Sequence, residues 1–239
     1  MSDLLDFVIE AHGGRERFNS FATLTAKLEQ GGILWALKGK TDVLAQANVR
    51  VDLREERVSH WPFAPTSRHS VFTPQRVTIE EEDGSIAEDL SKPRASFAGF
   101  EMETHWSDAQ LAYFAGYTMW TYLTSPFLIE RPGVVAKEIE SWQEAGESWR
   151  RLRVEFPDSI ATHSKVQDFY FDNKGLLRRH DYEVEIQGNN AASRYLLEPV
   201  EVQGITLYSK MRIVPNTPSN IPLSEPFIVT IDLSDYRFE

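Results

Sequence analysis

The amino-acid sequence predicts a mainly β domain of the α+β class. We expect one strongly curved antiparallel sheet, or half-barrel, of about ten to twelve strands with a central helix on its concave face. Most of the chain alternates apolar and polar side chains with a period of two, which is typical of strands. Turn signals such as Asp83-Gly84 separate these segments by a few residues, which favours local antiparallel pairing. One segment, 107–123, has a helical pattern instead. We expect a single domain over residues 1–239.

The N-terminal segment DLLDFVIEAHGG predicts an amphipathic helix. Leu4, Leu5 and Val8 form its apolar stripe. Gly13 and Gly14 end it, because glycine readily adopts the left-handed conformation that closes a helix. The segment RERFNSF then predicts a short helical turn before the first strand.

Strand-like alternation fills the chain on both sides of the central helix. Before the helix the predicted strands are ATLTAKLEQGGIL, VLAQANVRVDL, ERVSHWPF, HSVFT and RVTIEEE. After it they are VVAKEIESW, ESWRRLRVEF, SKVQDFYF, GLLRRHDYEVEI, ASRYLLEPVEV, GITLYSKMRIV and PFIVTIDLSDYRF. The proline-rich segment 215–226 is too short to separate domains and predicts a long loop.

The central segment SDAQLAYFAGYTMWTYL predicts a helix that Ser107 caps and Asp108 supports in the first turn. Apolar and aromatic residues cover most of its circumference, which indicates burial on more than one side. We therefore expect it inside a curved sheet. A flat sandwich of two sheets is the alternative.

Composition excludes several classes of protein. Acidic residues number 36 against 25 basic ones, giving a net charge of −11, which argues against nucleic acid or an anionic membrane as partner. The chain has no cysteine, which rules out disulfides and thiolate metal sites. No stretch approaches the roughly 18 apolar residues of a membrane span. The N-terminus lacks the features of a signal peptide. We expect a cytoplasmic chain without a cofactor.

The segment THSKVQDFYFDNKGLLRRHDY predicts a hairpin with polar groups on its buried face. With a turn at Asn173-Lys174, alternation places these side chains on that face: Gln167, Phe169, Arg178, His180, Tyr182 and Val184. The other face would carry an exposed ion pair between Asp168 and Arg179. A one-residue shift in register would exchange the two faces.

A guanidinium group among apolar side chains needs a carboxylate, water or an anionic ligand. We therefore predict that Gln167, Arg178, His180 and Tyr182, with His163 at the rim, form the polar end of a cavity. In the alternative interpretation Arg178 reaches the mouth of the half-barrel and Gln167 only hydrogen-bonds His180.

Aromatic residues would supply the walls of such a cavity. The candidates for ligand contact are Trp61, Trp106, Tyr117 and Trp120, with Tyr122 beside them. Flat rings suit an apolar ligand, although aromatic stripes are also typical of an ordinary core.

Two histidines are candidates for proton transfer. The chain has six, and none is spaced as a metal ligand with another, so we expect no metal site. His163 lies at the start of the hairpin, and His180 is the histidine that the predicted register buries. Histidine gains or loses a proton near neutral pH, as acid–base catalysis requires.

Several segments resemble those of an uncharacterised bacterial family of similar length. They are AHGGRERF, GGILWALKGK, HSVFTPQRV, PRASFAGF, LAYFAGYTMWTYLTSPF, SWQEAGESWRRLRVEFPDSIATHS and FYFDNKGLLRRHDY. More distantly, the GLL hairpin and the turn from Val202 to Ile205 resemble the LolA/LolB lipoprotein-carrier superfamily. That resemblance implies a half-barrel around a helix-plugged hydrophobic cavity that takes acyl chains. The chain departs from the exported carriers in lacking a signal peptide and a lipobox cysteine.

These observations leave three functions open. The first is binding of an apolar small molecule or lipid-like ligand, with an anionic head near Arg178. The second is an enzyme (isomerase, cyclase or hydrolase) that uses His163 or His180 as acid or base. The third is a protein-interaction module whose cavity is filled by its own core, which would instead expose a large apolar patch to a protein partner.

Overall fold

The computed structural model describes residues 3–63 and 67–239. The elements before the central helix are α1 (Asp3–Ala11), α2 (Arg15–Asn19), β1 (Thr23–Gly31), α3 (Leu34–Leu37), β2 (Gln46–Asp52), β3 (Val58–Trp61), β4 (His69–Thr73), β5 (Arg76–Glu80), β6 (Ile86–Ser91) and the 3-10 helix η1 (Pro93–Phe97). The central helix α4 is followed by the remaining elements: α4 (Asp108–Thr124), η2 (Phe127–Glu130), β7 (Val135–Glu144), β8 (Glu147–Glu155), β9 (Val166–Phe171), β10 (Leu177–Val184), η3 (Glu185–Gln187), β11 (Asn190–Val202), β12 (Ile205–Pro215) and β13 (Val229–Phe238).

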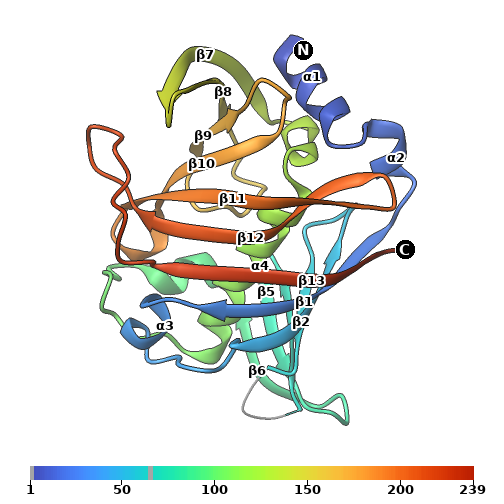
Figure 1. The fold of residues 1–239 in the computed structure, drawn as a ribbon. Helices are drawn as coiled ribbons and strands as arrows, with labels where there is room; N and C mark the ends of the chain where they lie inside the picture. The colour runs from blue at the N-terminus through green and yellow to red at the C-terminus, as the bar shows by residue number, and fades with distance from the viewer. Residues whose placement is uncertain (1–2, 64–66) are drawn as a thin grey trace.

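The thirteen strands of the described residues form one open, curved antiparallel sheet (Figure 1). Their order is β6-β5-β4-β3-β2-β1-β13-β12-β11-β10-β9-β8-β7. Each strand pairs with its sequence neighbour, except where the first and last strands, β1 and β13, meet and join two meanders. The predicted curved sheet is confirmed, with one strand more than the largest number expected.

Helix α1 carries the predicted apolar stripe, with Leu4, Leu5 and Val8 buried. Gly13 follows it with φ 111°, a conformation that glycine adopts without strain. A Cβ atom there would lie 2.1 Å from the carbonyl oxygen of Gly204. The glycine therefore allows the end of α1 to approach the turn between β11 and β12.

Helix α4 fills the inside of the curved sheet, as predicted. Ser107 caps it by accepting from the Gln110 amide at 3.1 Å, and its own amide donates to Gln110 Oε1 at 2.9 Å. Every residue after Asp108 is buried. One side of the helix packs against β2–β6, and Figure 1 shows it behind the strands β11–β13. Among the described residues no helix has the length and apolar character to cross a bilayer.

Candidate functional site

Strands β9 and β10 form the predicted hairpin, but in a different register. Phe171 pairs with Leu177, and Phe169 pairs with His180, because a bulge between Leu177 and Arg179 adds a residue to β10. The inner face keeps these predicted residues, all of them buried: Gln167, Phe169, His180, Tyr182 and Val184. Arg178 lies in the bulge, is only half-buried and does not line the cavity described below, so the structure does not place it at that cavity's polar end.

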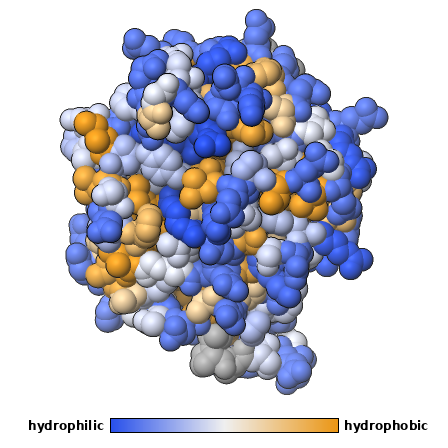
Figure 2. Space-filling view, in the orientation of Figure 1, coloured by the Kyte–Doolittle hydropathy of each residue, from blue (hydrophilic) through white to orange (hydrophobic). Residues whose placement is uncertain are grey.

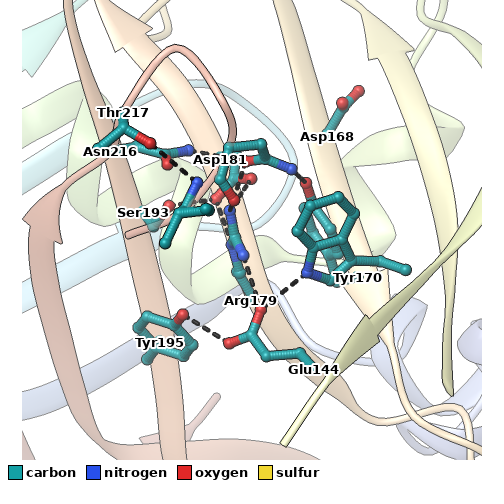
Figure 3. Close-up of polar contacts among 12 residues, drawn as sticks. Glu144, Asp168, Tyr170, Arg179, Asp181, Ser193, Tyr195, Asn216 and Thr217 are labelled. Carbon is teal, nitrogen blue, oxygen red and sulfur yellow. Dashed lines mark hydrogen bonds and ion pairs between the residues drawn. The ribbon is translucent and has the colours of Figure 1, made fainter. Parts of the chain in front are cut away.

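Arg179 was expected to be exposed and is instead fully buried on the outer face of β10 (Figure 3). Its Nε donates to Asp181 at 2.7 Å, Nη1 to Glu144 at 2.7 Å and Nη2 to Asn220 Oδ1 at 2.5 Å. The predicted partner, Asp168, pairs with Arg153 at 2.8 Å. Asp181 lies on β10 itself, whereas the end of β7 supplies Glu144 and the loop after β12 supplies Asn220. They cover a face that alternation alone had assigned to solvent.

On the inner face, Gln167 orients His180. Gln167 Nε2 donates to the Ser164 carbonyl at 2.7 Å, and Gln167 Oε1 lies 2.6 Å from His180 Nε2. A carbonyl only accepts, so the Gln167 amide must turn its oxygen toward His180 and the Nε2 atom of His180 must donate. The hydrogen bond predicted between these two residues is therefore present. In a neutral ring Nδ1 is then a free acceptor, and it has no partner among residues 3–63 and 67–239.

His163 is the centre of a second polar group, formed with three tyrosines. Its Nδ1 lies 3.3 Å from the Tyr117 hydroxyl and its Nε2 3.1 Å from that of Tyr122. The Tyr122 and Tyr182 hydroxyls are 2.5 Å apart. The His163 ring stacks on Tyr182 with centroids 3.8 Å apart. His163 is 1% exposed, so it lies inside the molecule and not at the rim.

Both inner histidines are uncharged at neutral pH. Burial lowers the pKa of His163 and of His180 well below the ordinary value, and the nearby charge of Arg194 adds to the effect. Neither ring can serve as an imidazolium acid near pH 7. A neutral ring can still accept a proton, so a role of His163 or His180 as a base stays a prediction.

An apolar cavity of about 30 Å³ lies between α4 and the inner face of the sheet. Its walls come from α3, α4, β1 and β10–β13: Gln30, Leu34, Trp35, Met102, Phe114, Ala115, Thr118, Met119, Tyr122, His163, Tyr182, Val184, Gln187, Asn190, Ala192, Ile213, Ile228, Val229 and Ile231. Gln30, Met102 and Asn190 are half-buried and mark its mouth. Its fully enclosed end is formed by Tyr122, Tyr182 and His163.

The predicted aromatic wall is mostly elsewhere. The Trp120 indole donates to the carbonyls of Asp52 and Glu55 at 3.1 and 3.0 Å, so it ties α4 to the turn after β2. Trp106 packs with Lys38 Nζ 4.7 Å from its ring. Trp61 is 37% exposed on β3. These three tryptophans do not line the cavity, and Tyr117 contributes only through His163.

Sequence reasoning missed Arg194, the cation that the inner face does contain. It is 0% exposed and lies opposite His180 on the neighbouring strand. Its guanidinium carbon is 3.7 Å from the centroid of the Tyr122 ring, and Nη1 is 3.9 Å from Met211 Sδ. Alternation was the available signal, because Ala192 and Leu196 on either side of Arg194 are apolar.

Sequence comparisons identify no relatives: no family model matches the chain, and no curated protein does. Within residues 3–63 and 67–239, no three or more acidic or histidine side chains are grouped as a metal site would require.

The fold resembles solved structures. A LolA superfamily protein from Nitrosomonas europaea aligns with TM-score 0.54 and 7% identity over 99% of this chain and 92% of the other. A putative outer membrane lipoprotein-sorting protein domain from Vibrio parahaemolyticus aligns with a TM-score of 0.55 and 9% identity, over 98% of this chain and 92% of the other. A DUF1329 family protein from Desulfovibrio piger aligns with a TM-score of 0.47 and 12% identity, over 99% of this chain and 92% of the other. The predicted LolA-like fold is confirmed.

These comparisons correct the expected location. The protein from Vibrio parahaemolyticus, whose fold this chain shares, is described as a putative outer membrane lipoprotein-sorting protein domain. The expectation of a cytoplasmic chain is therefore wrong. That expectation was based on the missing signal-peptide features and the absence of cysteine. Neither observation carries information about the fold.

Proposed function

We propose that this chain binds an apolar, lipid-like ligand between α4 and the inner face of strands β1 and β10–β13. The observation that carries the proposal is the cavity itself, which is walled by Trp35, Phe114, Met119 and aliphatic side chains. Pockets of this composition hold apolar molecules, and a few polar groups orient the ligand. The similar fold of a protein described as lipoprotein-sorting supports the same class of ligand.

Ligand entry requires the cavity to widen. Its volume of about 30 Å³ has room for one or two waters, whereas ligand pockets usually measure about 300–1,000 Å³. Two segments cover the mouth, α3 with Trp35 and the loop with Met102. Lys38 holds them together by donating to the carbonyls of Glu101 and Met102 at 3.1 and 2.5 Å. We infer that these segments separate from α4 when a ligand enters.

Apolar side chains outside the mouth fit this route. Ile33, beside α3, and Phe227, beside the cavity residue Ile228, are 43% and 44% exposed. Their backbones are joined by a hydrogen bond from the Ile33 amide to the Phe227 carbonyl at 3.1 Å. Figure 2 shows apolar surface along the left side of this view, over α3 and the β12–β13 loop. An apolar ligand would meet this surface before it enters.

Ala192→Leu should abolish binding, because it places three more carbons in the cavity. Ala191→Leu is the matched control, since Ala191 is the preceding residue of β11 and faces the other side of the sheet. Binding is measured with the neutral dye N-phenyl-1-naphthylamine, which fluoresces in apolar surroundings, and by its displacement with methyl oleate. Wild type and Ala191→Leu should bind alike. Equal binding by Ala192→Leu would show that the dye occupies another place.

A further inference from the structure

Arg194 is a buried cation whose charge is not balanced. Within residues 3–63 and 67–239 it forms no ion pair, and its Nε and Nη2 atoms have no hydrogen-bond partner. The compensation that the described residues give it is the Tyr122 ring at 3.7 Å and the Met211 sulfur at 3.9 Å. The comparison with Arg179 is direct, because that equally buried guanidinium contacts two carboxylates, those of Asp181 and Glu144.

The compensation that Arg194 receives is too weak to explain its burial. A cation–π contact replaces only part of the hydration that a guanidinium loses on burial, and a thioether is a weak acceptor. Burying an unpaired charge costs several kcal/mol. A purely structural role would be filled better by an apolar residue of the same length. The guanidinium therefore requires an acceptor that the described residues do not supply.

The position of Arg194 connects it to the cavity. Tyr122 both contacts the guanidinium and lines the enclosed end of the cavity, next to Tyr182 and His163. His180, directly opposite Arg194 on β10, has an acceptor without a partner at Nδ1. The unpartnered N–H donors of Arg194 thus lie behind the Tyr122 ring, at the enclosed end of the cavity. The His180 acceptor cannot bind an oxyanion, which has no proton to donate, so the donors of Arg194 alone define the anion site.

We propose that Arg194 binds the head group of the cavity ligand, and that this head is a singly charged oxyanion on an apolar chain. This inference rests on the proposed function. The charge number follows from the site, where one guanidinium can balance one negative charge. A fatty-acid carboxylate and a phosphodiester both meet that requirement. Rotation of the Tyr122 side chain brings the head group to the guanidinium, while the chain fills the space between α4 and the sheet.

The test compares wild type with Arg194→Met, using displacement of N-phenyl-1-naphthylamine by oleate, methyl oleate and dioleoylphosphatidylglycerol. Loss of a charge-assisted hydrogen bond should weaken binding of the anion about 10- to 100-fold. Methyl oleate, which has the same chain and no charge, should bind both proteins equally. The anion that loses affinity, oleate or the phospholipid, identifies the carboxylate or the phosphodiester as the head group.

Thermal melting separates this role from a structural one. Without ligand, Arg194→Met should melt no lower than wild type, because it removes an unbalanced charge. A variant that melts far lower and binds both oleate and dioleoylphosphatidylglycerol as wild type does would overturn the inference. So would wild type binding oleate and dioleoylphosphatidylglycerol no more tightly than methyl oleate, which would leave the proposed function standing. Failure of all three lipids to displace the dye would reject both.

Discussion

Arg179 and Arg194 lie on the neighbouring strands β10 and β11, and both are fully buried. Arg179 faces outward, where Asp181 and Glu144 accept its hydrogen bonds (Figure 3). Asn220 Oδ1 accepts a further one. Arg194 faces inward, where Tyr122 is its nearest compensation. A guanidinium with its carboxylates in place stabilises the fold, whereas one without them costs stability until an anion arrives. The two arginines therefore have different tasks.

At this scale we predict that Arg179→Met lowers the free energy of unfolding by about 3–5 kcal/mol, because it leaves Asp181 and Glu144 without their counter-charge. Arg153→Met is the control: its pair with Asp168 is on the surface, with Arg153 54% exposed, and should be worth about 0–1 kcal/mol. Urea denaturation measures both. Similar losses in the two variants would contradict the assignment of Arg179 as a structural residue.

At the scale of elements, α4 determines how much space the sheet encloses. Gly116 brings the helix close to β4: a Cβ atom there would lie 2.2 Å from the Phe72 ring. On the other side of α4, Ala115, Thr118 and Met119 face the cavity. Close packing on one side and a cavity on the other indicate that α4 belongs to the β2–β6 half, and that the mouth opens between α4 and the β10–β13 half.

Gly116→Ala tests this packing. In an exposed helix the change would stabilise by about 1 kcal/mol, but here overpacking against Phe72 should destabilise by roughly 1–3 kcal/mol. The double variant with Phe72→Leu should recover part of the loss, and a double-mutant cycle measures the coupling. Gly116→Ala more stable than wild type would show that the helix is free to shift.

The elements themselves were predictable because their signals are local. Alternation, the Ser107 cap and the all-round apolar surface of α4 are each contained in a short stretch of sequence. The bulge at Arg178 was not predictable, because it depends on how β10 packs against β9 and on what covers its outer face. Arg194 was within reach of alternation, but a sequence cannot show that a buried charge lacks a partner.

At the scale of the whole molecule, the closed interior makes stability depend on pH. Burial lowers the pKa of His12 to about 4 and of His60 to about 3, and lowers that of His163 and His180 as well. As the pH falls, the histidines of the unfolded chain bind protons at a higher pH than those of the folded chain. The contribution of these histidines to the free energy of unfolding is therefore fully present above about pH 6.5 and is lost as the pH falls below that value. Glu56 acts in the opposite direction, because burial raises its pKa to about 8. The contribution of Glu56 to the free energy of unfolding is therefore lost as the pH rises toward that value.

The histidines outnumber Glu56, so the free energy of unfolding should fall steadily from pH 6.5 to pH 4.5. His60→Leu should reduce that slope by up to about 1.4 kcal/mol per pH unit, the effect of one proton. Urea denaturation at a series of pH values measures it. His105→Gln is the control, because His105 is exposed, and its curve should run parallel to wild type. An unchanged slope in His60→Leu would show that His60 is hydrated in the native state.

The central claim is that the space between α4 and the sheet holds a lipid-like ligand, and native mass spectrometry of the purified protein tests it most directly. The spectrum should show the chain with a bound lipid-like molecule, present either from purification or after incubation with oleate and released on denaturation. Ala192→Leu should give the bare mass, and Ala191→Leu should match wild type. A bare mass for wild type under both conditions, or an adduct that survives unchanged in Ala192→Leu, would contradict the claim.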